Sequence, residues 1–162
     1  MLQTCTEMKE GLAMTKKNDK VLNLLKMEFL SLQENVGLAR VAVASFAAQD
    51  DLTLNELEEI KVAVSEAVSN SIIHGYDNSE KDVIKINIIR YEDRLQIEVI
   101  DEGKGIEDVD QAVQPAFSTD PERMGLGFVF MGSFMDVLTV NSKPGSGTQV
   151  IMEKKISNTL KN

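Results

Sequence analysis

A carboxylate and a carboxamide, Glu66 and Asn70, stand four residues apart in a stretch with helical periodicity. Four residues make about one helical turn, so both side chains share a face with His74, one turn further on. A carboxylate there can take a proton from an attacking hydroxyl, and a carboxamide oxygen is a hard ligand suited to Mg²⁺. The spacing by itself is more typical of a solvated polar face.

A glycine-containing loop begins where an apolar run ends, with Asp101, Gly103 and Gly105 at alternate positions. Glycines spaced in this way let the chain turn and let a flat ligand approach the backbone. The carboxylate of Asp101 can accept a hydrogen bond from an exocyclic amine such as that of adenine. A plain turn is the alternative interpretation of this loop.

Two further glycine segments follow. Gly125 and Gly127 open a helical run, where free N–H groups and the helix dipole favour phosphate, and Arg123 adds a cation beside them. Gly147 and Thr148 precede the last strand. Taken singly, the first segment is also compatible with a helix cap and the second with a hairpin turn.

Hydrophobic periodicity defines the elements that must position these residues. Strands are expected at 24–30, 83–89, 95–100, 137–141 and 148–155, and helices at 36–49, 54–74 and 125–135. Thr53 and Glu56 have the S/T-x-x-E spacing of a capping box, and Ser31 or Asn35 is the candidate cap of the earlier helix. This order predicts an α+β fold, a two-layer α/β sandwich with a mixed, mainly antiparallel sheet and helices on one face.

Bulk composition narrows the class of protein. A chain of 162 residues fits one domain, expected at 23–156 between an N-terminal extension at 1–22 without regular structure and a tail at 157–162. A net charge of −9 argues against direct binding of nucleic acid. One cysteine and no apolar run able to span a bilayer predict a cytoplasmic protein without a membrane anchor. Met14 is a candidate alternative start of translation.

In this order, the four motifs together resemble the GHKL ATPases and kinases, which share the Bergerat ATP-binding fold. The resemblance covers roughly 24–155. The residues that match the boxes of that family are Glu66 and Asn70, Asp101, Gly103 and Gly105, Gly125 and Gly127, and Gly147 and Thr148. It implies that ATP or ADP binds with Mg²⁺ held by Asn70 and the adenine amine read by Asp101. It also implies a phosphate site at Gly125 and Gly127 and support of the adenine end by Thr148.

Within that family the chain resembles the small anti-sigma-factor serine kinases, above all the anti-sigma-F type of sporulating bacteria. The matching stretches are 39–46, 64–76, 114–119 and 134–136. Members of that family form homodimers, inhibit an RNA polymerase sigma factor and phosphorylate a serine of a STAS-like anti-anti-sigma protein. The resemblance therefore implies that Glu66 is the general base and that Arg40 contacts both partners.

Several alternatives stay open at this stage. Without the family, Arg40 is an ordinary surface cation. His74 is expected to be a structural group rather than a phosphoacceptor. The chain as a whole could instead be a nucleotide-gated binding module without phosphotransfer, or a histidine-kinase-like catalytic fragment.

Overall fold

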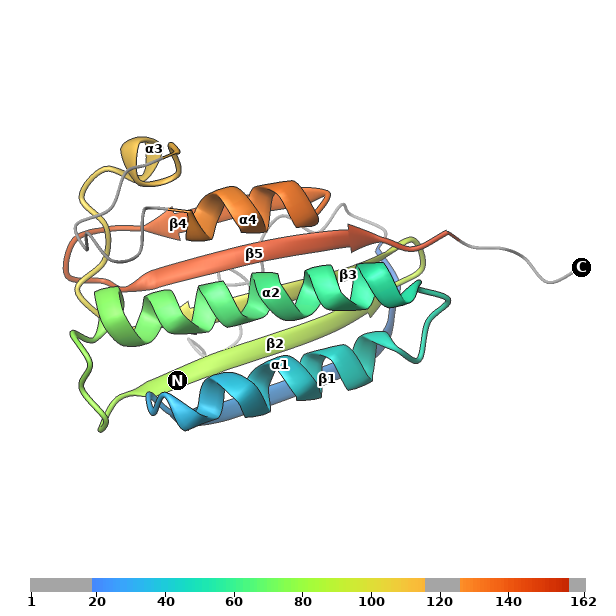
Figure 1. The fold of residues 1–162 in the computed structure, drawn as a ribbon, viewed down its shortest axis with the longest axis horizontal. Coiled ribbons are helices and arrows are strands. Elements are labelled where there is room, and N and C mark those ends of the chain that lie inside the picture. Colours follow the sequence, from blue (N-terminus) through green and yellow to red (C-terminus); the bar gives the residue numbers. More distant parts are fainter. Residues whose placement is uncertain (1–18, 116–125, 158–162) are drawn as a thin grey trace, which may run out of the picture.

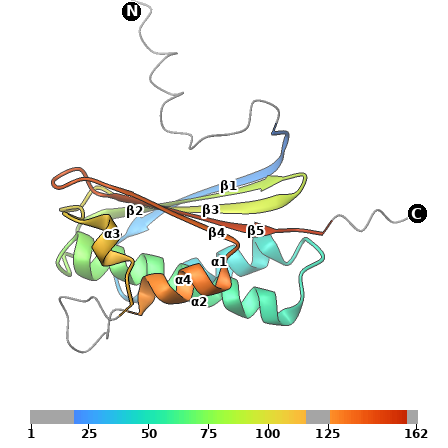
Figure 2. The same cartoon turned by 90° about the horizontal axis from the view of Figure 1, so that it is seen from above.

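A computed structural model describes residues 19–115 and 126–157 of the chain. Its strands form one sheet in the order β1-β2-β3-β5-β4, and the helices cover one face of this sheet (Figures 1 and 2). The expected two-layer α+β sandwich is thus confirmed. Each of the pairings β1–β2, β2–β3, β3–β5 and β4–β5 is antiparallel, so the described sheet is antiparallel rather than mixed.

The expected elements are found with small shifts at their ends. The strands are β1 Val21–Leu30, β2 Val83–Tyr91, β3 Arg94–Asp101, β4 Val137–Ser142 and β5 Thr148–Lys155. The helices are α1 Glu34–Ala47, α2 Leu54–Asn70, the π-helix η2 Ser71–Gly75, α3 Val109–Ala112 and α4 Gly127–Phe134. β1 begins inside the stretch expected to lack regular structure, because Val21 pairs with Tyr91 of β2. Met14 lies outside the described residues.

The start of α1 differs from the expectation. Gln33 is its N-cap residue, and no side chain caps the helix. The hydroxyl of Ser31 donates instead to the carbonyl of Ser79, and Asn35 Nδ2 donates to the Leu30 carbonyl at 2.9 Å. Both candidate caps were therefore wrong, because Ser31 bonds to the loop before β2 and Asn35 bonds back to the end of β1.

Two hydrophobic periodicities meet in the core. On α2, buried apolar residues recur every three or four positions, and on the central strands they alternate with outward-facing ones. The periodicity that predicts a helix over 54–74 places Leu57, Ile60, Val64, Val68 and Ile72 on one apolar stripe, and of these Ile60, Val64 and Val68 are fully buried. They pack in one cluster with Ile84, Ile86 and Ile88 of β2 and Leu95, Ile97 and Val99 of β3.

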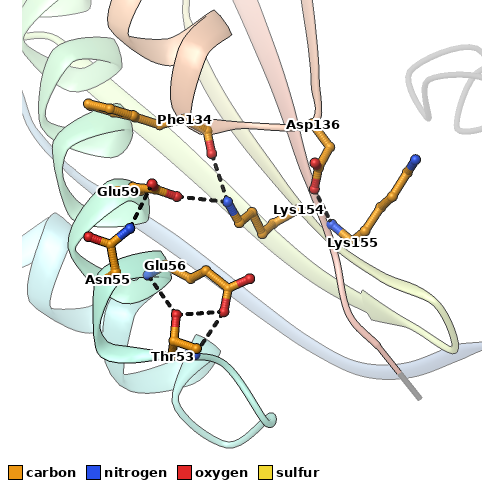
Figure 3. Close-up of polar contacts among 8 residues, drawn as sticks. All are labelled: Thr53, Asn55, Glu56, Glu59, Phe134, Asp136, Lys154 and Lys155. Atoms are coloured by element: carbon orange, nitrogen blue, oxygen red, sulfur yellow. Dashed lines mark hydrogen bonds and ion pairs between the residues drawn. The ribbon is translucent and has the colours of Figure 1, made fainter. Parts of the chain in front are cut away.

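A polar cluster fixes the ends of α2 and α4 that lie farthest from the motif residues (Figure 3). Thr53 caps α2 through the predicted box: the Glu56 amide donates to Thr53 Oγ1 at 3.2 Å, and the Thr53 amide donates to Glu56 Oε2 at 2.8 Å. Lys154 of β5 donates to Glu59 Oε2 and to the Phe134 carbonyl, both at 2.9 Å. That carbonyl ends α4, where a cation is favoured by the helix dipole.

Candidate functional site

The last turns of α2 lie against the first turn of α4. A Cβ placed on Gly127 would be 3.0 Å from Glu66 Oε2 and 3.2 Å from Asn70 Nδ2. Both side chains therefore face the N-terminus of α4, whose first main-chain N–H groups lack an intrahelical acceptor. The shared face predicted for Glu66 and Asn70 is found. His74 belongs to the π-helix η2. The three side chains therefore do not follow one another along a single α-helix, as was expected, because α2 ends at Asn70.

Such an arrangement places a carboxylate and a carboxamide beside a site suited to an anion. Among the described residues, no three His, Cys, Asp or Glu side chains gather into a metal site. Asn70 fits Mg²⁺ all the same, because this ion is usually held by few protein oxygens and takes further ligands from water and substrate phosphates.

Asp101 ends β3 and is only 5% exposed. Its Oδ1 accepts a hydrogen bond from the Gly103 amide at 3.0 Å, and its Oδ2 accepts one from Ser71 Oγ at 2.8 Å. Burial raises the pKa of the Asp101 carboxyl, and hydrogen bonds from Ser71, Gly103 and the Thr148 main chain act in the opposite direction. The carboxylate still has acceptor capacity for a further donor.

The glycines of this region allow three segments of backbone to approach closely. A Cβ on Gly103 would overlap the carbonyl of Gly75, which ends η2, and one on Gly105 would overlap the carbonyl of Lys143. A Cβ on Gly147 would overlap the Asp101 carbonyl. Gly105 and Gly147 also have φ of +74° and +76°, a region that favours glycine. Gly103 and Gly105 thus allow one segment of main chain to pack against another. This role differs from the expected one, which was to let a ligand approach the backbone.

Thr148 is the direct partner of Asp101 in the β3–β5 pairing. Its Oγ1 lies 2.8 Å from Ser142 Oγ, and this second hydroxyl accepts a hydrogen bond from the Ile106 amide at 2.8 Å. The predicted proximity of Thr148 to Asp101 is therefore found. The sequence alone did not indicate Ser142 or Ser71 as residues of the site. Only Ser71 could have been found in this way, because it directly follows Asn70.

The remaining predicted site residues fall in two groups. Arg123 and Gly125 lie outside the described residues, and their phosphate contacts stay predictions. Arg40 is exposed on α1.

No helix in the described part of the chain is long and apolar enough to cross a membrane.

Comparison with known proteins first identifies the class of this domain. Residues 29–154 match the family described as histidine kinase-like ATPase domain, so the fold and the motif residues define a nucleotide-binding domain of that class. The RsbU and RsbW domains of Rv1364c from Mycobacterium tuberculosis share this fold, with a TM-score of 0.61 at 15% identity over 83% of this chain and 32% of that one.

More similar sequences narrow the class to one family. The anti-sigma F factor of Clostridium beijerinckii is 47% identical, and the alignment covers 83% of this chain and 96% of the relative. The anti-sigma F factor of Caldanaerobacter subterraneus subsp. tengcongensis is 52% identical over 83% of this chain and 94% of the relative. The chain belongs to the anti-sigma F factor family.

Proposed function

We propose that this protein is an ATP-dependent protein serine kinase that also binds and inhibits a sporulation sigma factor of the sigma-F type. The observation that supports the kinase part best is the packing of Glu66 and Asn70 against the N-terminus of α4. The family relationship supports the anti-sigma part.

In this proposal each residue has one task. Asp101 accepts the adenine amino group, with Thr148 beside it, and Asn70 provides an oxygen ligand for Mg²⁺, which neutralises phosphate charge when bound. The substrate serine Oγ attacks the γ-phosphorus, the bond from that phosphorus to the β–γ bridging oxygen breaks, and ADP leaves. Glu66 accepts the proton of the serine hydroxyl. The products are phosphoserine, ADP and a protonated Glu66.

The partner-binding surface is proposed on α1. Arg40 is exposed there, and the next residue, Val41, is 58% exposed. Leu38, three residues before Val41 and on the same face as it, is 60% exposed. A cation next to exposed apolar side chains is a composition favoured at protein interfaces. This composition supports a contact of Arg40 with the sigma factor and with the STAS-like anti-anti-sigma protein, both cytoplasmic partners in this proposal.

A homodimer is the remaining part of the proposal. β1 is an edge strand of the sheet, so one side of its main chain has no neighbouring strand among the residues that the structure describes. Leu25 and Phe29 of β1 pack toward the core, whereas Leu24 and Leu30, at alternating positions, are exposed. An edge strand with exposed leucines supports pairing with a second copy.

Incubation with ATP, Mg²⁺ and the STAS-like protein tests the proposal. We expect serine phosphorylation of that protein and its loss in Glu66→Gln, whereas Glu58→Gln, a change on the exposed surface of α2, keeps it. Sigma-factor binding that depends on nucleotide, without phosphate transfer, would favour the binding module instead. Phosphohistidine on this chain or a partner would favour the histidine-kinase-like fragment.

A further inference from the structure

The hydroxyl of Ser71 makes an unusual contact for a serine in a helical segment. Ser71 is 5% exposed and is the first residue of η2. Its Oγ donates across to Asp101 Oδ2 of β3, thirty residues further along the chain. The contact therefore joins the residue directly after Asn70 to the carboxylate proposed to read adenine.

Other helical serines of this protein provide an internal comparison. Ser65 Oγ donates to the Lys61 carbonyl at 2.7 Å, and Ser133 Oγ donates to the Val129 carbonyl at 2.8 Å. Such bonds to the carbonyl four residues earlier are the usual contacts of serine within a helix. Ser71 gives up this local acceptor for a buried carboxylate, which makes a charge-assisted and stronger hydrogen bond.

The geometry around Asp101 gives this bond a consequence for binding. The Gly103 amide holds Oδ1, and the Ser71 hydroxyl holds Oδ2. Donors on both oxygens fix the rotation of the carboxylate. Gly103 and Thr148 bond to it through the main chain, so of these three donors only the Ser71 hydroxyl can be removed by a substitution. Because a carboxylate can accept more than these three hydrogen bonds, the fixed group can still receive an amino group.

We propose that Ser71 is a positioning residue that sets the Asp101 carboxylate for the adenine amino group and so contributes to the choice of base. This inference rests on the proposed function, because it requires that Asp101 contacts adenine.

Equilibrium binding of two nucleotides to the full chain tests the inference. ATP carries the 6-amino group, and purine riboside triphosphate lacks it. We expect Ser71→Ala to weaken ATP binding roughly fivefold, the effect of one hydrogen bond, and to leave binding of the analogue unchanged. Ser71→Thr, which keeps a hydroxyl, should restore the preference for ATP. Ser133→Ala is the matched control, because it removes a serine hydroxyl that bonds only within α4.

The outcomes separate this inference from the proposed function. Equal weakening of both nucleotides in Ser71→Ala would assign Ser71 a purely structural role and overturn the inference, as would no change in either. A native chain that binds neither nucleotide would overturn the proposed function itself. Thermal unfolding of each variant checks that the fold is intact.

Discussion

Gly127 lies against Glu66 so closely that a Cβ on the glycine would be 3.0 Å from Glu66 Oε2. The absence of a side chain at the start of α4 therefore determines where the carboxylate of α2 can lie. Contacts as short as this require the neighbour to move by a few tenths of an ångström. Glu66 and Asn70 are the side chains that would have to move. A larger residue in place of Gly127 would therefore change the geometry of the site.

Gly127→Ala is expected to reduce phosphotransfer with little loss of stability. Alanine favours the helix, but its methyl group displaces Glu66 and Asn70, and small misplacements of catalytic groups cost roughly ten- to a hundredfold in rate. Gly132→Ala is the control in the same helix, since its Cβ would meet only Leu138 at an ordinary 3.8 Å. Steady-state kinetics and thermal unfolding distinguish the two; equal activity of both variants would contradict the prediction.

Gly103→Ala is expected to damage the fold of the site itself. The new methyl group would overlap the main-chain carbonyl of Gly75, which cannot rotate away as a side chain can. We expect a loss of roughly 1–3 kcal/mol in the free energy of unfolding, as for other overpacked positions, together with weaker ATP binding. Urea denaturation and calorimetric binding measure the two effects.

Gly37→Ala is the matched control for this change. Gly37 lies in α1, and a Cβ there would meet nothing within 4 Å. Alanine is favoured over glycine in a helix by about 1 kcal/mol, so this variant should be more stable than the native protein. If both alanine variants were destabilised alike, close backbone contact would not be the cause.

Local patterns in the sequence predicted much of this structure. The stripe of α2, the capping box of Thr53 and Glu56, and the alternating strands depend on neighbours a few residues apart, and all were confirmed. The grouping of Glu66 and Asn70 on one face follows from the period of the helix alone.

Contacts between distant segments could not be predicted in this way. Ser71 is thirty residues from the carboxylate to which it donates, and only the folded sheet brings them together. Tertiary contact also decided the role of Ser31, which has the composition of a helix cap but donates to the carbonyl of Ser79. Likewise, the spacing of Gly103 and Gly105 indicated a special loop, but the backbone that each one contacts depends on the packing of three segments.

Glu56 predicts a dependence of stability on pH. Hydrogen bonds from the main chain and then the side chain of Thr53 lower the pKa of Glu56 below its ordinary value. A lowered pKa in the folded state means that the carboxylate stabilises the fold above its unfolded pKa and loses this effect as pH falls through the folded pKa. The native protein should therefore be more stable than Glu56→Gln at pH 7, by a few tenths to about 1 kcal/mol, as for other helix caps.

Urea denaturation of both proteins between pH 7 and pH 3 measures this difference. It should narrow below the ordinary pKa of 4.5 for glutamate. Glu92→Gln, a change at the exposed turn between β2 and β3, serves as the control. A difference between native protein and Glu56→Gln that stayed constant across this range would contradict the role of the charge.

Lys154 predicts a coupling between β5, α2 and α4. Its ammonium group is largely buried and contacts Glu59 Oε2 and the Phe134 carbonyl at 2.9 Å each, as Figure 3 shows. Lys154→Met keeps an unbranched side chain, one atom shorter, but leaves both acceptors without this donor. The expected loss is about 1–3 kcal/mol in the free energy of unfolding, the cost of leaving hydrogen-bonding groups unpaired.

A double-mutant cycle with Glu59→Gln separates the ion pair from the helix-end contact. In Lys154→Met the Glu59 carboxylate keeps its hydrogen bond from Asn55 Nδ2 but loses its cation. Removing the charge of Glu59 removes that cost, so the double variant should lose less stability than the sum of the two single changes. The part of the loss that remains belongs to the Phe134 carbonyl, which no longer has its cation at the end of α4. Strict additivity in urea denaturation would show that Lys154 and Glu59 do not act as a pair.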